Sequence, residues 1–173
     1  MLMVQLKQNQ PRIKHDIPVT GQERVLQALT LIAFLWGIGY LIAQWSDLPA
    51  TVPAHYNGKG EIDRWGSKWE LAILPGIGLI LYVGLTILSR FPHLYNYPVT
   101  ITEENAVRQY LLARKMIGWT NLEILVLFSY IEWTSIQSAL GKGDGMSMWS
   151  IPILLIAIFG TMAIYFVRAF RSK

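Results

Sequence analysis

Cysteine is absent from the 173-residue chain, and charged residues are scarce. Without cysteine the protein can form no disulfide, thiolate nucleophile, zinc–cysteine site or iron–sulfur cluster. Charged residues make up 15% of the chain and apolar residues 53%, whereas soluble domains average about 25% charged. The formal charge of +4 could indicate nucleic acid, but the basic residues flank apolar blocks instead of forming a stripe. We therefore expect a lipid bilayer as the partner and no nucleic acid.

The apolar residues fall into four blocks, each close to the length that crosses a hydrocarbon core about 30 Å thick. The sequence predicts an all-α membrane protein, a four-helix transmembrane bundle over residues 21–168. The predicted spans are residues 25–45, 71–89, 117–136 and 151–167, with an outer loop at 46–70 and an inner loop or helix at 90–116. Residues 1–20 are expected to form a mobile cytoplasmic tail and residues 169–173 a second, short one.

The distribution of lysine and arginine predicts the orientation. Eleven of the 15 lie in the two tails or between the second and third blocks, and four lie in the other two loops. Cytoplasmic loops carry the excess of basic residues, so both termini should be cytoplasmic. Most of the tryptophans fall near predicted helix ends, as an aromatic belt at the membrane surface requires. They are Trp36, Trp45, Trp65, Trp69, Trp119, Trp133 and Trp149.

Short local patterns mark the helix starts. The capping boxes are Thr20 with Glu23, Ser67 with Glu70, and Thr100 with Glu103. Thr102 is a competing cap for the third, and nothing breaks the chain after it. One long helix is therefore predicted from about Glu103 to Ile136. Small residues at helical spacing are predicted to pack within the bundle: Ala33 and Gly37, Gly76 and Gly84, and Ala157, Gly160 and Ala163.

The outer loop carries a strong turn signal. Pro49 and Pro53 favour an extended first half, and Asn57-Gly58 followed by Gly60 favours a tight turn. A short hairpin is predicted, with His55-Tyr56 facing Ile62-Asp63. We expect it to form an ordered cap over the outer helix ends.

Three side chains of this loop could bind a divalent metal or act as acid and base: His55, Glu61 and Asp63. Their spacing fits no recognised metal motif, so His55 is instead expected to hydrogen-bond within the loop, without a metal or other cofactor. The candidate binding residues of the whole chain are His55, Asn57, Asp63, Lys68 and Glu123.

The inner segment offers a docking surface for a cytoplasmic protein. The candidates are Glu103, Glu104, Arg108, Tyr110 and Arg114. The alternative, which we favour, is a helix that lies against the inner membrane surface or the neighbouring loop.

Two carboxylates fall within the third block. Glu123 lies about 9 Å from the predicted helix entry and should face the bundle, protonated or paired. Glu132 lies near the predicted outer end, where it can reach the interface beside Trp133. The two are nine residues apart, about half a turn out of phase. They cannot form a paired-carboxylate site within one chain.

Two stretches together resemble one bacterial membrane family. The first is Leu48-Pro49, Pro53-x-His55-x-Asn57, Gly60, Asp63, Trp65 and Lys68. It is similar to a domain of unknown function, DUF1648, that forms the N-terminal part of SdpI-type bacteriocin immunity proteins. The second, from Tyr95 to Tyr110 and on to Arg114, resembles stand-alone members. The resemblance implies a bacterial plasma-membrane protein related to immunity proteins that resist a secreted toxin and draw a repressor to the membrane.

Three functions remain open on this reading. The leading hypothesis is a non-enzymatic membrane protein that binds an extracellular peptide or signals to a cytoplasmic regulatory protein. The second is a small transporter or ion-coupled carrier that uses Glu123 and needs a homo-oligomer to build a pathway. The third is a metal-assisted enzyme at the outer face that uses His55, Glu61 and Asp63.

Overall fold

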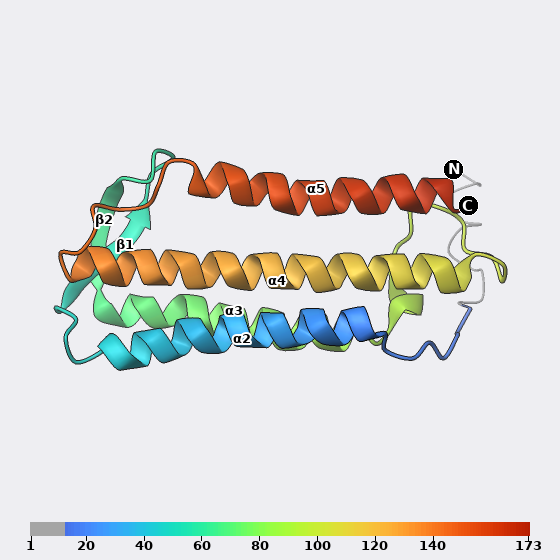
Figure 1. Ribbon diagram of the computed structural model, residues 1–173, viewed down its shortest axis with the longest axis horizontal. Helices are drawn as coiled ribbons and strands as arrows, with labels where there is room; N and C mark the ends of the chain where they lie inside the picture. The colour runs from blue at the N-terminus through green and yellow to red at the C-terminus, as the bar shows by residue number, and fades with distance from the viewer. Residues whose placement is uncertain (1–12) are drawn as a thin grey trace, which may run out of the picture.

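The computed structural model describes residues 13–173 and contains four long helices that lie side by side, with a small sheet across one end (Figure 1). The helices are α2 (Gly21–Gln44), α3 (Ile73–Leu88), α4 (Ala106–Ala139) and α5 (Ser150–Arg171). Three helical segments are long and apolar enough to cross a membrane: Gly21–Gln44, Lys68–Leu88 and Ser150–Arg171. The prediction of a mostly helical membrane protein is confirmed. The small sheet is the short hairpin predicted for the loop at 46–70.

The longest helix, α4, lies in the middle of the structure. It packs against α2 and α3 on one side and against α5 on the other (Figure 1). The buried residues of α2 recur every three or four positions, which is the spacing of one helix face. They are Glu23, Leu26, Thr30, Phe34, Gly37 and Leu41. Because α4 is covered on two opposite faces, polar residues on both faces can find partners on other helices.

Two of the predicted capping boxes form. Thr20 and Glu23 cap α2. Ser67 and Glu70 cap a short 3₁₀ helix, η1 (Lys68–Ala72), that leads into α3. The third prediction is wrong: α4 begins at Ala106, and Glu103 lies in the turn before it.

Thr102 pairs with Asn105 in the turn that precedes α4, and Asn105, the N-cap residue, makes no side-chain capping bond to the helix. The Thr102 amide donates to Asn105 Oδ1 at 2.9 Å, and the Asn105 amide donates to Thr102 Oγ1 at 3.4 Å.

The outer loop forms the predicted hairpin. Strands β1 (Thr51–Tyr56) and β2 (Ile62–Ser67) pair antiparallel, with Tyr56 opposite Ile62. The register shifts on either side of His55, whose backbone partner is Arg64. Gly60 closes the turn with φ +82°, a conformation that L side chains rarely adopt.

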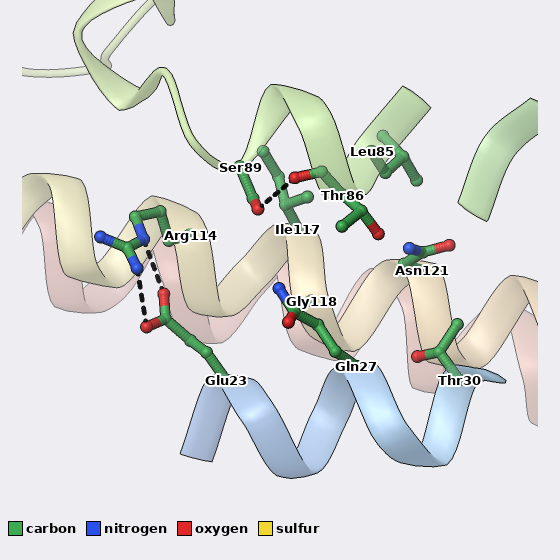
Figure 2. Close-up of a pocket in the computed structure, with 10 residues that line it drawn as sticks. All are labelled: Glu23, Gln27, Thr30, Leu85, Thr86, Ser89, Arg114, Ile117, Gly118 and Asn121. Carbon is green, nitrogen blue, oxygen red and sulfur yellow. Dashed lines mark hydrogen bonds and ion pairs between the residues drawn. The ribbon is translucent and has the colours of Figure 1, made fainter. Parts of the chain in front are cut away.

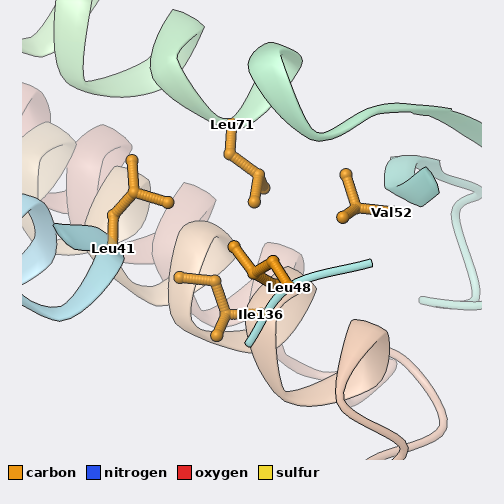
Figure 3. Close-up of a cluster of buried hydrophobic side chains, with 5 residues drawn as sticks. All are labelled: Leu41, Leu48, Val52, Leu71 and Ile136. Atoms are coloured by element: carbon orange, nitrogen blue, oxygen red, sulfur yellow. The ribbon is translucent and has the colours of Figure 1, made fainter. Parts of the chain in front are cut away.

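A small apolar cluster holds the hairpin against the helix ends. Its members come from α2, the following loop, β1, η1 and α4 (Figure 3): Leu41, Leu48, Val52, Leu71 and Ile136. Trp45 packs on this cluster and meets the Trp69 ring edge-on, with ring centroids 4.8 Å apart. The hairpin is therefore packed against the helix ends.

Small residues divide between the bundle and its surface. Gly37 lies against α4, where an added Cβ would come within 2.8 Å of Ser129 Oγ. A Cβ added at Gly76, Gly84 or Gly160 would have no neighbouring atom within 4 Å. The predicted bundle packing is therefore confirmed for Gly37 and wrong for these three glycines.

Candidate functional site

The hairpin brings several of the predicted binding residues together at the end of the bundle that the sequence predicts to face outward, here called the outer end; the opposite end is called the inner end. His55 Nδ1 lies 2.6 Å from Asp63 Oδ1, a contact between two largely exposed side chains. Asn57 organises the turn, because its Oδ1 accepts from the Lys59 and Glu61 amides at 2.8 and 3.1 Å. His55 thus hydrogen-bonds within the loop, as predicted.

The third member of the proposed metal or acid–base group lies apart. Glu61 accepts a hydrogen bond from the Asn57 side chain at 2.8 Å and makes no bond with His55. Over residues 13–173, no group of three or more His, Asp or Glu side chains is arranged to hold a metal ion. A further ion pair joins Arg64 and Glu70 at 2.8 Å and ties β2 to η1.

The hairpin is bonded to α4 and to the loop that follows it. The Tyr56 hydroxyl lies 3.0 Å from Ser135 Oγ on α4, and burial raises the pKa of this tyrosine. The Met146 amide donates to the Gly60 carbonyl at 2.9 Å. Lys68 Nζ lies 4.8 Å from the centre of the Trp45 ring. Among the predicted binding residues, Lys68 therefore stabilises the loop itself.

At the inner end, side chains of α4 bind the chain's own N-terminal segment. Arg114 and Glu23 form a bidentate ion pair, with Nε–Oε1 at 2.7 Å and Nη2–Oε2 at 2.9 Å (Figure 2). Arg114 also donates to the Ile17 carbonyl at 2.9 Å, and the Tyr110 hydroxyl donates to the Ile13 carbonyl at 2.6 Å. Residues 13–20 of the predicted mobile tail are thus bonded to α4, and residues 1–12 lie outside the described part.

The same region anchors the end of α5. Gln109 is fully buried, and its side-chain amide donates to the Ala169 and Ser172 carbonyls, both at 2.9 Å. These carbonyls lie at the C-terminal end of α5, where a helix has no backbone donors of its own. Gln109 therefore acts as a C-terminal cap supplied by another helix.

These contacts divide the predicted docking residues into two groups. Tyr110 and Arg114 are 2% and 5% exposed and bind the chain itself, so they offer no surface to a partner. Glu103, Glu104 and Arg108 are exposed. Glu103 lies 3.3 Å from His15 Nε2.

Two tyrosines secure the inner loop that leads to α4. Tyr95 donates to the Leu88 carbonyl at 2.7 Å, and Tyr97 donates to the Pro92 carbonyl at 2.8 Å. Burial raises the pKa of both hydroxyls, so both stay protonated and keep donating. Pro92 opens a short 3₁₀ helix, η2 (Pro92–Leu94). The inner loop is therefore held to the end of α3.

The two carboxylates of α4 lie on opposite faces, as their spacing predicts. Glu123 accepts a hydrogen bond from Thr161 on α5 at 2.6 Å. Glu132 faces α2, is 3% exposed, and lies beside Gly37. The prediction that Glu132 reaches the membrane interface beside Trp133 is wrong, because its side chain is buried against α2.

Sequence reasoning missed Gln109, Asn121 and Ser129 as buried polar residues of α4. Their spacing carries a signal in retrospect: with Arg114 and Glu132, Asn121 and Ser129 recur on a single helix face. A polar face within an apolar block indicates a helix interior to a membrane bundle.

The comparisons with known proteins identify one domain of the chain. Residues 29–79, which run from α2 through the hairpin into α3, match the family described as "Domain of unknown function (DUF1648)". An uncharacterized protein from Archaeoglobus fulgidus is 34% identical over an alignment of 124 residues, and the match covers 66% of this chain and 66% of that protein. No solved structure matches. The predicted DUF1648 domain is thus confirmed, and the named relative is archaeal.

Proposed function

Because the chain carries a DUF1648 domain and three apolar helices, we propose that it is a four-span membrane protein without enzymatic activity. It binds a ligand at the outer hairpin and passes that event to the inner face through α4. Both termini are cytoplasmic, and the membrane is the plasma membrane of a prokaryote. The proposed fourth span is α4. It lies alongside three apolar helices and buries its polar side chains against them, which supports this assignment.

One observation carries the proposal: a single continuous helix of 34 residues contacts both candidate surfaces. Its outer part bonds the hairpin through Ser135, and its inner part bonds both ends of the described chain through Tyr110, Arg114 and Gln109. A movement of the hairpin would therefore act on the same rigid element that positions the inner surface.

The topology is tested with single cysteines in a chain that has none of its own. Lys59 in the hairpin turn and Arg108 near the start of α4 are both exposed. We expect a membrane-impermeant thiol reagent to label Lys59→Cys in intact cells and Arg108→Cys only after permeabilisation. Labelling of Arg108→Cys in intact cells would contradict the orientation. Labelling of both in intact cells would contradict the span of α3, which lies between the two positions; α4 is tested in the same way by Lys142→Cys, which should be labelled in intact cells.

Binding is tested by purifying the tagged protein from its native membrane together with its partners. A His55→Ala, Asp63→Ala variant removes the exposed outer pair, and a Glu104→Arg, Arg108→Glu variant alters the inner surface. One partner should be lost with each variant, while Lys142→Ala in the exposed α4–α5 loop should retain both. If every partner survives both variants, the hairpin and the inner surface are not the binding sites.

The other two functions have less support. Glu123 as a coupling group is held by Thr161 on α5. An enzyme at the outer face would need Glu61 beside His55, and Glu61 bonds Asn57 instead. Immunity to a secreted toxin remains one form that outer binding could take. A homo-oligomer would use helix surfaces that are exposed in the single chain, such as those around Gly76 and Gly160.

A further inference from the structure

The contact of α4 with α2 and α3, here called the seam, contains buried polar side chains that the binding function does not use. Asn121, Ser129 and Glu132 of α4 are 5%, 7% and 3% exposed. Ser129 donates to the Ala33 carbonyl at 2.8 Å. Asn121 Oδ1 and Glu132 Oε1 are buried and have no hydrogen-bond partner. In a bilayer an ionisable side chain such as Glu132 is costly, and residues of this kind mark ion pathways and proton relays.

Two small cavities lie along this seam. The inner one, about 20 Å³, is lined by Thr30, Thr86 and Asn121 and by the Glu23–Arg114 pair at its cytoplasmic end (Figure 2). The Thr86 hydroxyl is also buried without a partner. The outer cavity, about 10 Å³, contains Ser129 and Glu132 among apolar side chains. About 10–15 Å³ is enough for one water, so the inner cavity accepts one and the outer is at the limit.

Apolar side chains close the seam on both sides of Glu132. Toward the inner cavity, Leu125 is 1% exposed and fills the space between Phe34 and Gly78. An added Cβ at Gly78 would come within 3.1 Å of Leu125 Cδ1. Toward the outside, the cluster that contains Leu41, Leu71 and Ile136 covers the helix ends (Figure 3). Glu132 is thus enclosed between two apolar closures.

We propose that Glu132 is a proton-binding site and that protons cross the seam by way of its carboxyl group when the Leu125 closure opens. A proton arriving from the inner cavity adds to the carboxylate, and the same O–H bond breaks when the proton leaves outward. The inference rests on the four-span arrangement above and is independent of any hairpin ligand.

The chemistry of the outer cavity selects a proton over a metal cation. Among the residues that line it from α2, α3 and α4, Glu132 is the sole titratable group and Ser129 the sole other polar side chain. A sodium ion needs several oxygen ligands or a hydration shell, and the cavity holds at most about one water. One carboxyl group without a cationic partner is sufficient for a proton.

Proton flux into liposomes tests the proposal. The purified full chain is reconstituted with an internal pH dye, and a potassium gradient with valinomycin sets the membrane potential. We expect a slow flux for the wild type, a several-fold rise for Leu125→Ala, and a fall for Gly78→Ala. Glu132→Gln should abolish the flux, also when combined with Leu125→Ala. Flux equal to that of protein-free vesicles in both the wild type and Leu125→Ala overturns the proposal.

Two further measurements keep the outcome decisive. Glu123→Gln removes the carboxyl group on the opposite face of α4, so the proton flux should persist in this variant. If Glu123→Gln loses the flux and Glu132→Gln retains it, the assignment to Glu132 is wrong. Should Glu132→Gln fail to fold, labelling of the wild type by a membrane-permeant carbodiimide, mapped by mass spectrometry, replaces it. Glu132 should be modified, less so at high pH, and an unmodified Glu132 counts against the site. Correct cysteine labelling without flux refutes this inference alone.

Discussion

The contact between Gly37 and α4 permits a sharp test of the helix packing. A Cβ at position 37 would lie 2.8 Å from Ser129 Oγ, 3.1 Å from Glu132 Oε2 and 3.3 Å from Ser129 Cβ. All three distances are shorter than ordinary van der Waals contacts, so Gly37→Ala must displace α2 or the Ser129 side chain. The matched control is Gly39→Ala, two residues along the same helix, where an added Cβ meets nothing within 4 Å.

Two effects lower the stability of Gly37→Ala and one raises it. Overpacking of a well-packed site costs about 1–3 kcal/mol. Displacing Ser129 weakens its hydrogen bond to the Ala33 carbonyl, worth about 1 kcal/mol. Replacing glycine by alanine within a helix gains about 1 kcal/mol. Gly37→Ala should therefore lose about 1–3 kcal/mol of unfolding free energy, whereas Gly39→Ala should be neutral or gain up to about 1 kcal/mol.

Equilibrium unfolding of the purified protein in bicelles measures the difference. Combining Gly37→Ala with Ser129→Ala removes the nearest clashing atom, so the double variant should be less unstable than the sum of the two single variants. Equal stability of Gly37→Ala and Gly39→Ala would refute the close approach of α2 to α4 at this point.

Two other predictions use the same unfolding measurement. Arg114→Ala leaves the Glu23 carboxylate buried without its cation and should cost about 3–5 kcal/mol; a cost below about 1 kcal/mol, the range of exposed pairs, would contradict a buried pair. Glu123→Gln should keep the bond with Thr161 and change stability little, whereas Glu123→Leu should cost about 1–3 kcal/mol by leaving the Thr161 hydroxyl unpaired. A Leu variant as stable as the wild type would mean that the Glu123–Thr161 bond contributes nothing.

Helix positions were predictable because the signals are local. An apolar run of membrane length and a capping box both lie within one segment, so α2 and η1 begin where Thr20 and Ser67 indicate. The capping patterns at Thr100 and Thr102 predict a helix that starts at about Glu103, whereas α4 begins at Ala106. Thr102 pairs with Asn105 across the turn that precedes the helix. Competing caps within one turn differ by too little free energy for sequence alone to rank them.

The roles of individual side chains depended on contacts between distant segments. The sequence predicts that Tyr110 and Arg114 are available to bind a partner protein. In the structure, residues 13–18 return to α4, and both side chains donate hydrogen bonds to this segment instead. The position of Glu132 differs from its prediction for a simpler reason. The apolar block predicts a helix end at Ile136, whereas α4 continues for almost another turn, the hairpin covers its end, and Glu132 is buried.

The polar content of α4 is also what holds the four helices together. Between helices in lipid there is no hydrophobic driving force, so hydrogen bonds and close packing must provide the attraction. Along its length α4 supplies them alternately to its two sides. Arg114 and Ser129 bond α2 through Glu23 and the Ala33 carbonyl.

Toward α5, Gln109, Glu123 and Tyr130 bond its inner end, its middle and its outer end. The features that make α4 less apolar than its neighbours therefore explain why it is the central helix. They also explain why α5, whose surface is otherwise mostly exposed, stays packed antiparallel to it.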